Sequence, residues 1–291
     1  MSDQLSNRIN QIKPSATMAV NAKATKLRQE GRNIINLSVG EPDFDTPEFI
    51  KEAAIKAIHD GHTKYTAADG IPELKTAIIN KLKNDNDLDY TPQQIMVSDG
   101  LKQVFYNLTQ ALLNEGDEVI IPAPYWVSYP DMVKLTGAKP VIVNCTEENR
   151  LKISPKQLEN AITDKTKLFI LNSPNNPTGM AYTLEELKAL GEVLKKHPNI
   201  VIASDDIYEY ILWGMDHYVN ILNACPELKD RTVVGNGLST AYAMTGWRIG
   251  YAAAPEHIIS GMNKVQSQST TCSNSIAQYA SVAALNGGRD F

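Results

Sequence analysis

The stretch Ile95-Met96-Val97-Ser98-Asp99-Gly100-Leu101-Lys102-Gln103 decides the fold class of this chain. Its first three residues have the apolar character of a buried strand, and a helix-like run over residues 101–113 begins directly after the glycine. Free N–H groups and the positive end of a helix dipole make such a turn a natural phosphate cradle. Most glycine turns before helices are only turns, so the motif alone leaves both interpretations open.

The same alternation of strand-like and helix-like runs continues along the chain. The strand-like runs are continuously apolar, as in strands that are covered on both faces. Thr183-Leu184-Glu185-Glu186 is a capping box that opens a helix ending near Lys196, before Pro198. We therefore expect an α/β fold with a mostly parallel central sheet flanked by helices. The predicted strands are residues 95–97, 119–121, 141–143, 168–171, 200–203, 232–234 and 249–253.

Composition narrows the class of protein. A net charge of −5 over 291 residues, with no basic stretch, argues against a nucleic-acid partner. The three cysteines follow neither a disulfide nor a metal-binding spacing, so no metal site is expected. The N-terminus lacks the apolar core of a signal peptide, and no uncharged apolar run approaches the roughly 18 residues that span a bilayer. We expect a cytoplasmic protein without a membrane partner.

Polar and aromatic residues follow the predicted strands, where parallel sheets bind their ligands. Tyr125-Trp126 is either a pair of core aromatics or a ring that stacks on a flat heteroaromatic cofactor. The run Asn175-Asn176-Pro177-Thr178-Gly179 is a turn signal, and its functional interpretation is an Asn176 amide that donates to a phenolate oxygen.

Three further residues each have a possible role in binding the same cofactor ring or its phosphate. Asp205 is either a helix cap or a buried carboxylate that pairs with a protonated pyridine nitrogen. Tyr208, three residues later, could reach the phenolate oxygen of the same ring. Arg248 is either a surface arginine at a strand start or a bidentate phosphate partner.

Taken in order, these motifs resemble the cofactor ligands of class I, fold-type I aminotransferases, which depend on pyridoxal 5′-phosphate (PLP). The resemblance covers residues 15–291 and implies the PLP-transferase large-domain fold, amino-acid and 2-oxo-acid substrates, and a homodimer. The 124–130 and 243–248 segments look most like those of bacterial aspartate aminotransferases. The matching cofactor positions are Gly100, Leu101, Lys102, Trp126, Asn176, Asp205, Tyr208 and Arg248.

The resemblance extends upstream of the predicted sheet. Residues 38–44 look like the family's entry strand, whose glycine, here Gly40, lies against the substrate carboxylate. Trp126 and Asn176 are the other implied substrate contacts. Tyr65, before the Gly70-Ile71-Pro72 turn, looks like the tyrosine that reaches the phosphate of the neighbouring subunit.

Thr240 departs from the family pattern. The segment Ser239-Thr240-Ala241-Tyr242-Ala243-Met244-Thr245-Gly246-Trp247-Arg248 resembles the family segment that carries the Schiff-base lysine. A threonine hydroxyl cannot form an imine and is a poor base at neutral pH, so Thr240 is not competent for the lysine's role. If PLP binds, we expect it to bind noncovalently.

A second motif in this region has a competing interpretation. Gly235-Asn236-Gly237-Leu238-Ser239-Thr240 resembles the start of a dinucleotide-binding GxGxxG. The next predicted strand begins near Arg248, which leaves no room for the crossover helix of a βαβ unit. We therefore reject the dinucleotide interpretation.

The resemblance also implies a domain organisation. Residues 1–47 are expected to form an N-terminal arm and part of a small domain, and residues 48–291 the PLP-binding large domain, with the C-terminal small domain absent after Phe291. By resemblance the function is transfer of the amino group of an L-amino acid, with aspartate as the expected donor, to a 2-oxo acid such as 2-oxoglutarate. The alternative is a catalytically impaired PLP-binding remnant or a nonfunctional truncated product, because Thr240 replaces the lysine.

Overall fold

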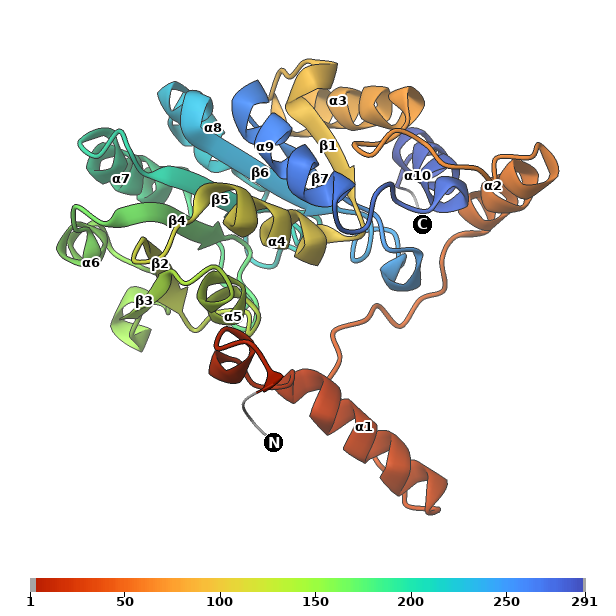
Figure 1. The fold of residues 1–291 in the computed structure, drawn as a ribbon, viewed down its shortest axis with the longest axis horizontal. Helices are drawn as coiled ribbons and strands as arrows, with labels where there is room; N and C mark the ends of the chain where they lie inside the picture. The colour runs from red at the N-terminus through yellow and green to blue at the C-terminus, as the bar shows by residue number, and fades with distance from the viewer. Residues whose placement is uncertain (1–3, 290–291) are drawn as a thin grey trace.

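The fold is built on a seven-stranded sheet with the strand order β1-β7-β6-β5-β4-β2-β3 (Figure 1). The computed structural model describes residues 4–289. β7 runs antiparallel to both neighbours and all other neighbouring pairs are parallel, so the predicted mostly parallel sheet is confirmed. The strands are β1 (Ile95–Ser98), β2 (Glu118–Ala123), β3 (Lys139–Asn144), β4 (Thr166–Asn172), β5 (Val201–Asp205), β6 (Thr232–Gly237) and β7 (Gly250–Ala253).

The inner strands are continuously apolar because each one faces two separate hydrophobic cores. Val119 and Ile121 of β2 pack into one core, whereas Ile120 between them packs into the other. Successive side chains of a strand point to opposite faces, so a strand covered on both sides has no face for polar residues. The edge strand β3 differs, because only one side of it has a neighbouring strand and its residues are exposed or half-buried.

Helices cover both faces of the sheet (Figure 1). The core on one face is completed by α4, α5 and α9, and the core on the other by α2, α3, α6, α7, α8 and α10. The predicted capping box is confirmed, since the Glu186 N–H donates to Thr183 Oγ1 and the Thr183 N–H donates to Glu186 Oε2. The helices are α1 (Ala16–Gln29), α2 (Glu48–His59), α3 (Pro72–Asn86), α4 (Leu101–Leu112), α5 (Tyr129–Lys134), α6 (Pro155–Ala161), α7 (Leu184–Lys195), α8 (Ile221–Ala224), α9 (Glu256–Ser267) and α10 (Ser275–Asn286). Within residues 4–289, none of them has both the length and the apolar content to cross a bilayer.

The segment before α2 corrects one expectation. Residues 38–44 were predicted to form an entry strand, but they are irregular, and Figure 1 shows α1 standing apart from the sheet at the other end of this segment. A strand needs a partner for its N–H and C=O groups, and no described residue forms a ladder with this segment. The segment is held by side chains instead, because Thr245 donates to Glu41 (2.7 Å) and Thr46 donates to the Ala243 carbonyl (2.6 Å).

The sheet brings the predicted site residues to one edge. β1, β2, β4, β5 and β6 run in the same direction, so their C-terminal ends meet there. β7 begins at the same edge, where Gly250 pairs with both Ser98 and Gly237. β6 and β7 are therefore joined by a short irregular connection, which agrees with the rejection of a dinucleotide-binding βαβ unit.

Gly250 permits the closest packing at this edge. A Cβ at this position would lie 2.3 Å from the Leu101 nitrogen and 2.5 Å from the Gly100 carbonyl carbon. Both of these are backbone atoms at the start of α4, so they cannot rotate out of the way. The turn before α4 therefore rests directly on the first residue of β7.

We expect the variant Gly250→Ala to lower the free energy of unfolding by about 1–3 kcal/mol, measured by urea denaturation, because overpacking displaces backbone. Gly246→Ala is the matched control, since a Cβ at Gly246 would have no atom within 4 Å. Equal stability of the two variants would contradict the packing described for this edge.

Candidate active site

The turn before α4 offers backbone donors at a helix N-terminus. Gly100 is the residue before the first turn of α4 and has a φ of +85°. No described residue accepts a hydrogen bond from the N–H groups of Leu101 or Lys102. Unpaired N–H groups at the positive end of a 12-residue helix bind anions, phosphate above all.

Arg248 lies directly against this turn. Its Nη2 donates to the Asp99 carbonyl at 3.2 Å and its Nη1 to the Thr245 carbonyl at 3.0 Å. A Cβ at Gly100 would lie 2.4 Å from Nη2, so glycine is required both for the positive φ and for this approach. The Arg248 guanidinium and the backbone N–H groups of Leu101 and Lys102 together form a positively charged site that is suited to an anion.

Lys102 and Trp126 lie beside each other at this end of the site. The Lys102 ammonium is 4.9 Å from the centre of the Trp126 ring, a distance typical of a cation–π contact. Burial, and then the Arg248 cation, lower the pKa of Lys102. Trp126 in turn meets Tyr129 edge to face, with ring centres 5.2 Å apart.

Asp205, the last residue of β5, is a buried carboxylate. It is 4% exposed, and it accepts hydrogen bonds from the Tyr129 hydroxyl and, at 3.2 Å, from the Ile207 N–H. Burial raises its pKa to about 6, against the lowering effect of these two donors. No cation within residues 4–289 pairs with it. A cationic group beside Asp205 would therefore be strongly favoured.

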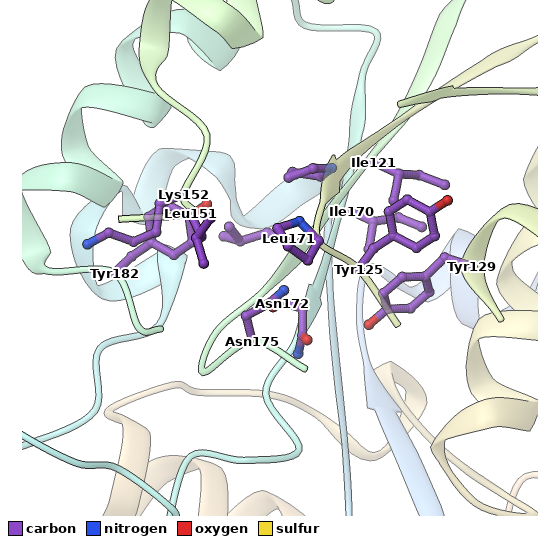
Figure 2. A pocket seen from close by; sticks show the side chains of 12 residues that line it. Ile121, Tyr125, Tyr129, Leu151, Lys152, Ile170, Leu171, Asn172, Asn175 and Tyr182 are labelled. Carbon is purple, nitrogen blue, oxygen red and sulfur yellow. The ribbon is translucent and has the colours of Figure 1, made fainter. Parts of the chain in front are cut away.

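Two residues that support this carboxylate were not identified from the sequence. Tyr129, the first residue of α5, is fully buried and donates to Asp205. Asn172, the last residue of β4, donates to the Asp205 carbonyl at 3.1 Å and accepts from the Asn176 N–H at 2.8 Å. Both border a small enclosed cavity, in which Figure 2 shows Tyr129 beside Tyr125. The position of Asn172 at a strand end was the one signal in the sequence.

Asn176 and Tyr208 meet across the strand ends. The Asn176 amide donates to the Tyr208 hydroxyl at 3.2 Å. Burial raises the pKa of Tyr208, and the nearby Asp205 charge acts in the same direction. The pair therefore presents two neutral hydrogen-bond donors at neutral pH.

A large cavity of about 1100 Å³ opens next to this pair. Its wall includes Gly40, Asn176, Tyr208 and Thr240, which the sequence had placed in one site. The described residues that line it include no lysine. A carbonyl compound bound in this cavity therefore has no lining amine with which to form a covalent bond.

Seven of the predicted site residues do not line this cavity: Tyr65, Gly100, Leu101, Lys102, Trp126, Asp205 and Arg248. The side chain of Tyr65 is 92% exposed and does not line the cavity. Among the described residues, no group of three or more His, Cys, Asp or Glu side chains is placed to hold a metal ion. The neutral donors Asn176 and Tyr208 line the large cavity, whereas the anion site and the buried Asp205 carboxylate are not part of its wall.

The chain is similar to known proteins over almost its whole length. Residues 32–290 match the family model for aminotransferase class I and II. The aspartate/prephenate aminotransferase of Nitrosomonas europaea is 60% identical over 284 residues, which are 98% of this chain and 72% of the relative. The aspartate aminotransferase of Bacillus subtilis is 52% identical over the same number of residues, again 98% of this chain and 72% of the relative.

Solved structures of aspartate aminotransferases share the fold. The enzyme from Rhizobium meliloti superposes with a TM-score of 0.95 at 48% identity, covering 99% of this chain and 72% of that one. The Thermus thermophilus enzyme with maleate superposes with a TM-score of 0.93 at 46% identity, covering 97% of this chain and 73% of that one.

The raised pKa of Asp205 predicts how the stability of the cofactor-free protein depends on pH. The folded protein retains the Asp205 proton up to about pH 6, whereas the unfolded chain loses it near pH 3.9. The contribution of this group to stability is therefore complete below about pH 4 and is lost as the pH rises through 6.

We expect Asp205→Asn to flatten the fall in unfolding free energy between pH 4 and pH 7 by about 2–3 kcal/mol relative to the unsubstituted protein. Urea denaturation at several pH values measures this difference. Asp131→Asn removes a half-exposed carboxylate of α5 and serves as the control. An unchanged slope in Asp205→Asn would show that Asp205 titrates as an ordinary carboxyl group.

Proposed function

The chain belongs to the class I and II aminotransferase family, and we propose that it transfers the amino group of L-aspartate to a 2-oxo acid such as 2-oxoglutarate. Membership in this family makes it a transaminase that acts on amino acids and 2-oxo acids. Aspartate as the donor is supported by relatives that are 52–60% identical and carry aspartate in their names. The Thermus thermophilus enzyme was solved with maleate, which is a four-carbon dicarboxylate like aspartate.

The alternative interpretation gains no support from these comparisons. An impaired cofactor-binding remnant or a nonfunctional product was considered because of Thr240. The relatives that match 98% of the chain are named as aminotransferases. We therefore treat Thr240 as a feature that affects how the cofactor is held.

The observation that carries the proposal is the buried Asp205 carboxylate without a cationic partner. PLP combines the three features that the site matches: a phosphate, a basic ring nitrogen and a phenolate oxygen. In this proposal the Gly100–Lys102 turn and Arg248 hold the phosphate, while Asp205 holds the ring nitrogen in its protonated form. The bound cofactor supplies an electron sink for the negative charge that develops on the substrate α-carbon.

Other side chains of the chain orient this ring and the substrate. Asn176 and Tyr208, joined at 3.2 Å, donate toward the phenolate oxygen. Trp126 stacks on the ring, and its edge contact with Tyr129 fixes the angle of the indole. Gly40 lines the cavity, and a Cβ there would have no atom within 4 Å, so this position leaves room for the substrate carboxylate. The role of Asp205 depends on Tyr129, whose hydroxyl keeps the carboxylate oriented.

Thr240 determines how the cofactor is retained. It lies on the cavity wall in the connection between β6 and β7, and no lysine lines that wall among the described residues. A hydroxyl forms no imine with an aldehyde, so PLP would be held here by noncovalent contacts alone, namely those to its phosphate, its ring nitrogen and its phenolate oxygen, together with stacking. Each charge-assisted hydrogen bond of this kind contributes about 1.5–3 kcal/mol, so several together retain the cofactor without a covalent bond.

We also propose a homodimer and a cytoplasmic location. Tyr65 is almost fully exposed, as a residue that serves a neighbouring subunit would be. The irregular segment between α1 and α2 exposes Ile35 (84%) and Leu37 (90%), which a partner subunit would cover. All three cysteines are free thiols in the structure, as in proteins of a reducing compartment.

Transfer of ¹⁵N from labelled L-aspartate to 2-oxoglutarate tests the proposed function. We expect ¹⁵N-glutamate to form in the presence of PLP, and the rate to rise roughly 10²- to 10⁴-fold in Thr240→Lys, because that variant gains a general base. Thr240→Arg adds the same charge without a base or an imine-forming amine and is the matched control. Mass spectrometry of the product glutamate gives the rate.

A second readout examines cofactor attachment in the same samples. After borohydride reduction, a pyridoxyl adduct should appear on the peptide of residue 240 in Thr240→Lys alone. An adduct on Lys102 of the unsubstituted protein would show that the anchor has moved to another residue. Absence of ¹⁵N transfer in every sample would overturn the proposed function.

A further inference from the structure

A buried polar network joins α3 to the two chain segments that carry Tyr208 and Thr240. Lys81 and Asn86 belong to α3, Glu209 directly follows Tyr208, and Asn236 lies on β6 four residues before Thr240. All four side chains belong to residues that are 3–7% exposed. None of these residues was singled out by the sequence, because they come from three separate parts of the chain.

Both carboxylate oxygens of Glu209 accept hydrogen bonds from other members of the network. Its Oε1 accepts from Lys81 and from the Asn236 amide (2.7 Å), and its Oε2 accepts from the Asn86 amide (2.7 Å). Lys81 also donates to Asn86 Oδ1 at 2.7 Å. The two charges therefore balance each other, and both carboxylate oxygens are satisfied without solvent.

The network fixes the backbone on either side of it. Asn236 Oδ1 accepts from the Gly237 N–H at 2.7 Å, at the C-terminal end of β6. The Glu209 N–H donates to the Asp206 carbonyl at 3.0 Å, which closes the turn that contains Tyr208. Glu209 is thus tied to α3 and β6 through its side chain and to the end of β5 through its backbone.

Net stabilisation does not explain why these charges are buried. Taking a lysine and a glutamate out of water is costly, and an apolar pair of similar volume is often equally stable or more stable. A buried ion pair does, however, tolerate only one arrangement of its partners, because any displacement leaves a charge without its hydrogen bonds. The pair is therefore suited to fixing the position of the residue next to Glu209.

We propose that the Lys81–Glu209 pair is a positioning device that holds the Tyr208 hydroxyl against the cofactor ring. This inference rests on the proposed function, since it assigns a support to one of the cofactor contacts. Lys81 acts from α3, which contributes no residue to the wall of the large cavity. The pair does not touch the cofactor, so its effect passes through Tyr208.

The test uses the double variant Lys81→Met/Glu209→Gln. It removes both charges together, while the amide introduced at residue 209 still accepts from Asn236 and can donate to Asn86 after a flip of the Asn86 amide. We expect a melting temperature within a few degrees of the unsubstituted protein and a PLP dissociation constant that rises roughly 3- to 10-fold, the effect of one misplaced hydrogen bond. Fluorescence titration with PLP measures the constant.

Two controls separate positioning from a general loss of structure. Lys152→Met/Glu186→Gln removes another ion pair with a buried lysine, neither residue of which lines the large cavity, and should leave the PLP constant unchanged. In a Tyr208→Phe background, Lys81→Met/Glu209→Gln should have no further effect on the constant, because the hydroxyl on which the pair acts is gone.

The outcomes distinguish this inference from the proposed function. If the unsubstituted protein binds PLP and Lys81→Met/Glu209→Gln binds it equally well, the positioning role is overturned and the function stands. An equal rise of the constant with and without the Tyr208 hydroxyl would also overturn it, because the effect would not pass through Tyr208. If the unsubstituted protein does not bind PLP, the proposed function fails and this inference fails with it.

Discussion

The carboxylate of Asp205 is buried at the end of β5, where none of the residues that the structure describes supplies a cation to neutralise it, and the rest of the site depends on this constraint. An ionised carboxylate in such a place is unfavourable, which is why burial raises its pKa to about 6. Either a proton or a cationic ligand relieves the cost. A pyridine nitrogen placed beside Asp205 is therefore held in its protonated form, and this protonation gives the PLP ring its capacity to withdraw electrons.

The sheet keeps this carboxylate apart from a second buried acid. Asp206 follows directly in the chain and accepts from Ser204 (2.6 Å) and Asn220, on the other side of the strand from Tyr129. Burial raises its pKa to about 7, and Glu209 acts in the same direction. Because successive residues of an extended chain point to opposite faces, two adjacent acids occupy two different environments. The Asp205 side chain faces Tyr129 and the candidate site, whereas the Asp206 side chain is held by Ser204 and Asn220.

Much of the architecture could be predicted from local sequence. The seven apolar runs and the capping box at Thr183 are encoded by neighbouring residues, and all were confirmed within three residues of their ends. Strand order and the reversal of β7 could not be derived from the runs themselves, because they depend on contacts between distant segments. The error at residues 38–44 has the same origin, since a strand-like sequence forms a strand only where a partner is available.

In the candidate site too, some residues could be predicted from local sequence, whereas others depend on contacts between distant segments. Residues at or just after strand ends, such as Asp205 and Asn176, are marked by a change from apolar to polar residues, and in the fold Asn172 forms hydrogen bonds with both. Tyr129 reads as an ordinary core aromatic, because its hydrogen bond crosses 76 positions of the chain. Lys81 reads as a surface lysine on a helix, because its partner Glu209 is 128 residues away. The sequence around a residue therefore identifies side chains that contact a ligand better than it identifies the residues that hold those side chains in place.

The protonation state of the ring nitrogen tests the central claim most directly. ¹⁵N NMR of PLP labelled at the ring nitrogen, bound to the protein at pH 8, reports whether this atom carries a proton, with free PLP at the same pH as the reference. The account predicts the chemical shift of a protonated pyridinium in the unsubstituted protein and of an unprotonated pyridine in Asp205→Ala. An unprotonated nitrogen in the unsubstituted protein would contradict the account, because Asp205 would then be buried for a reason other than its charge.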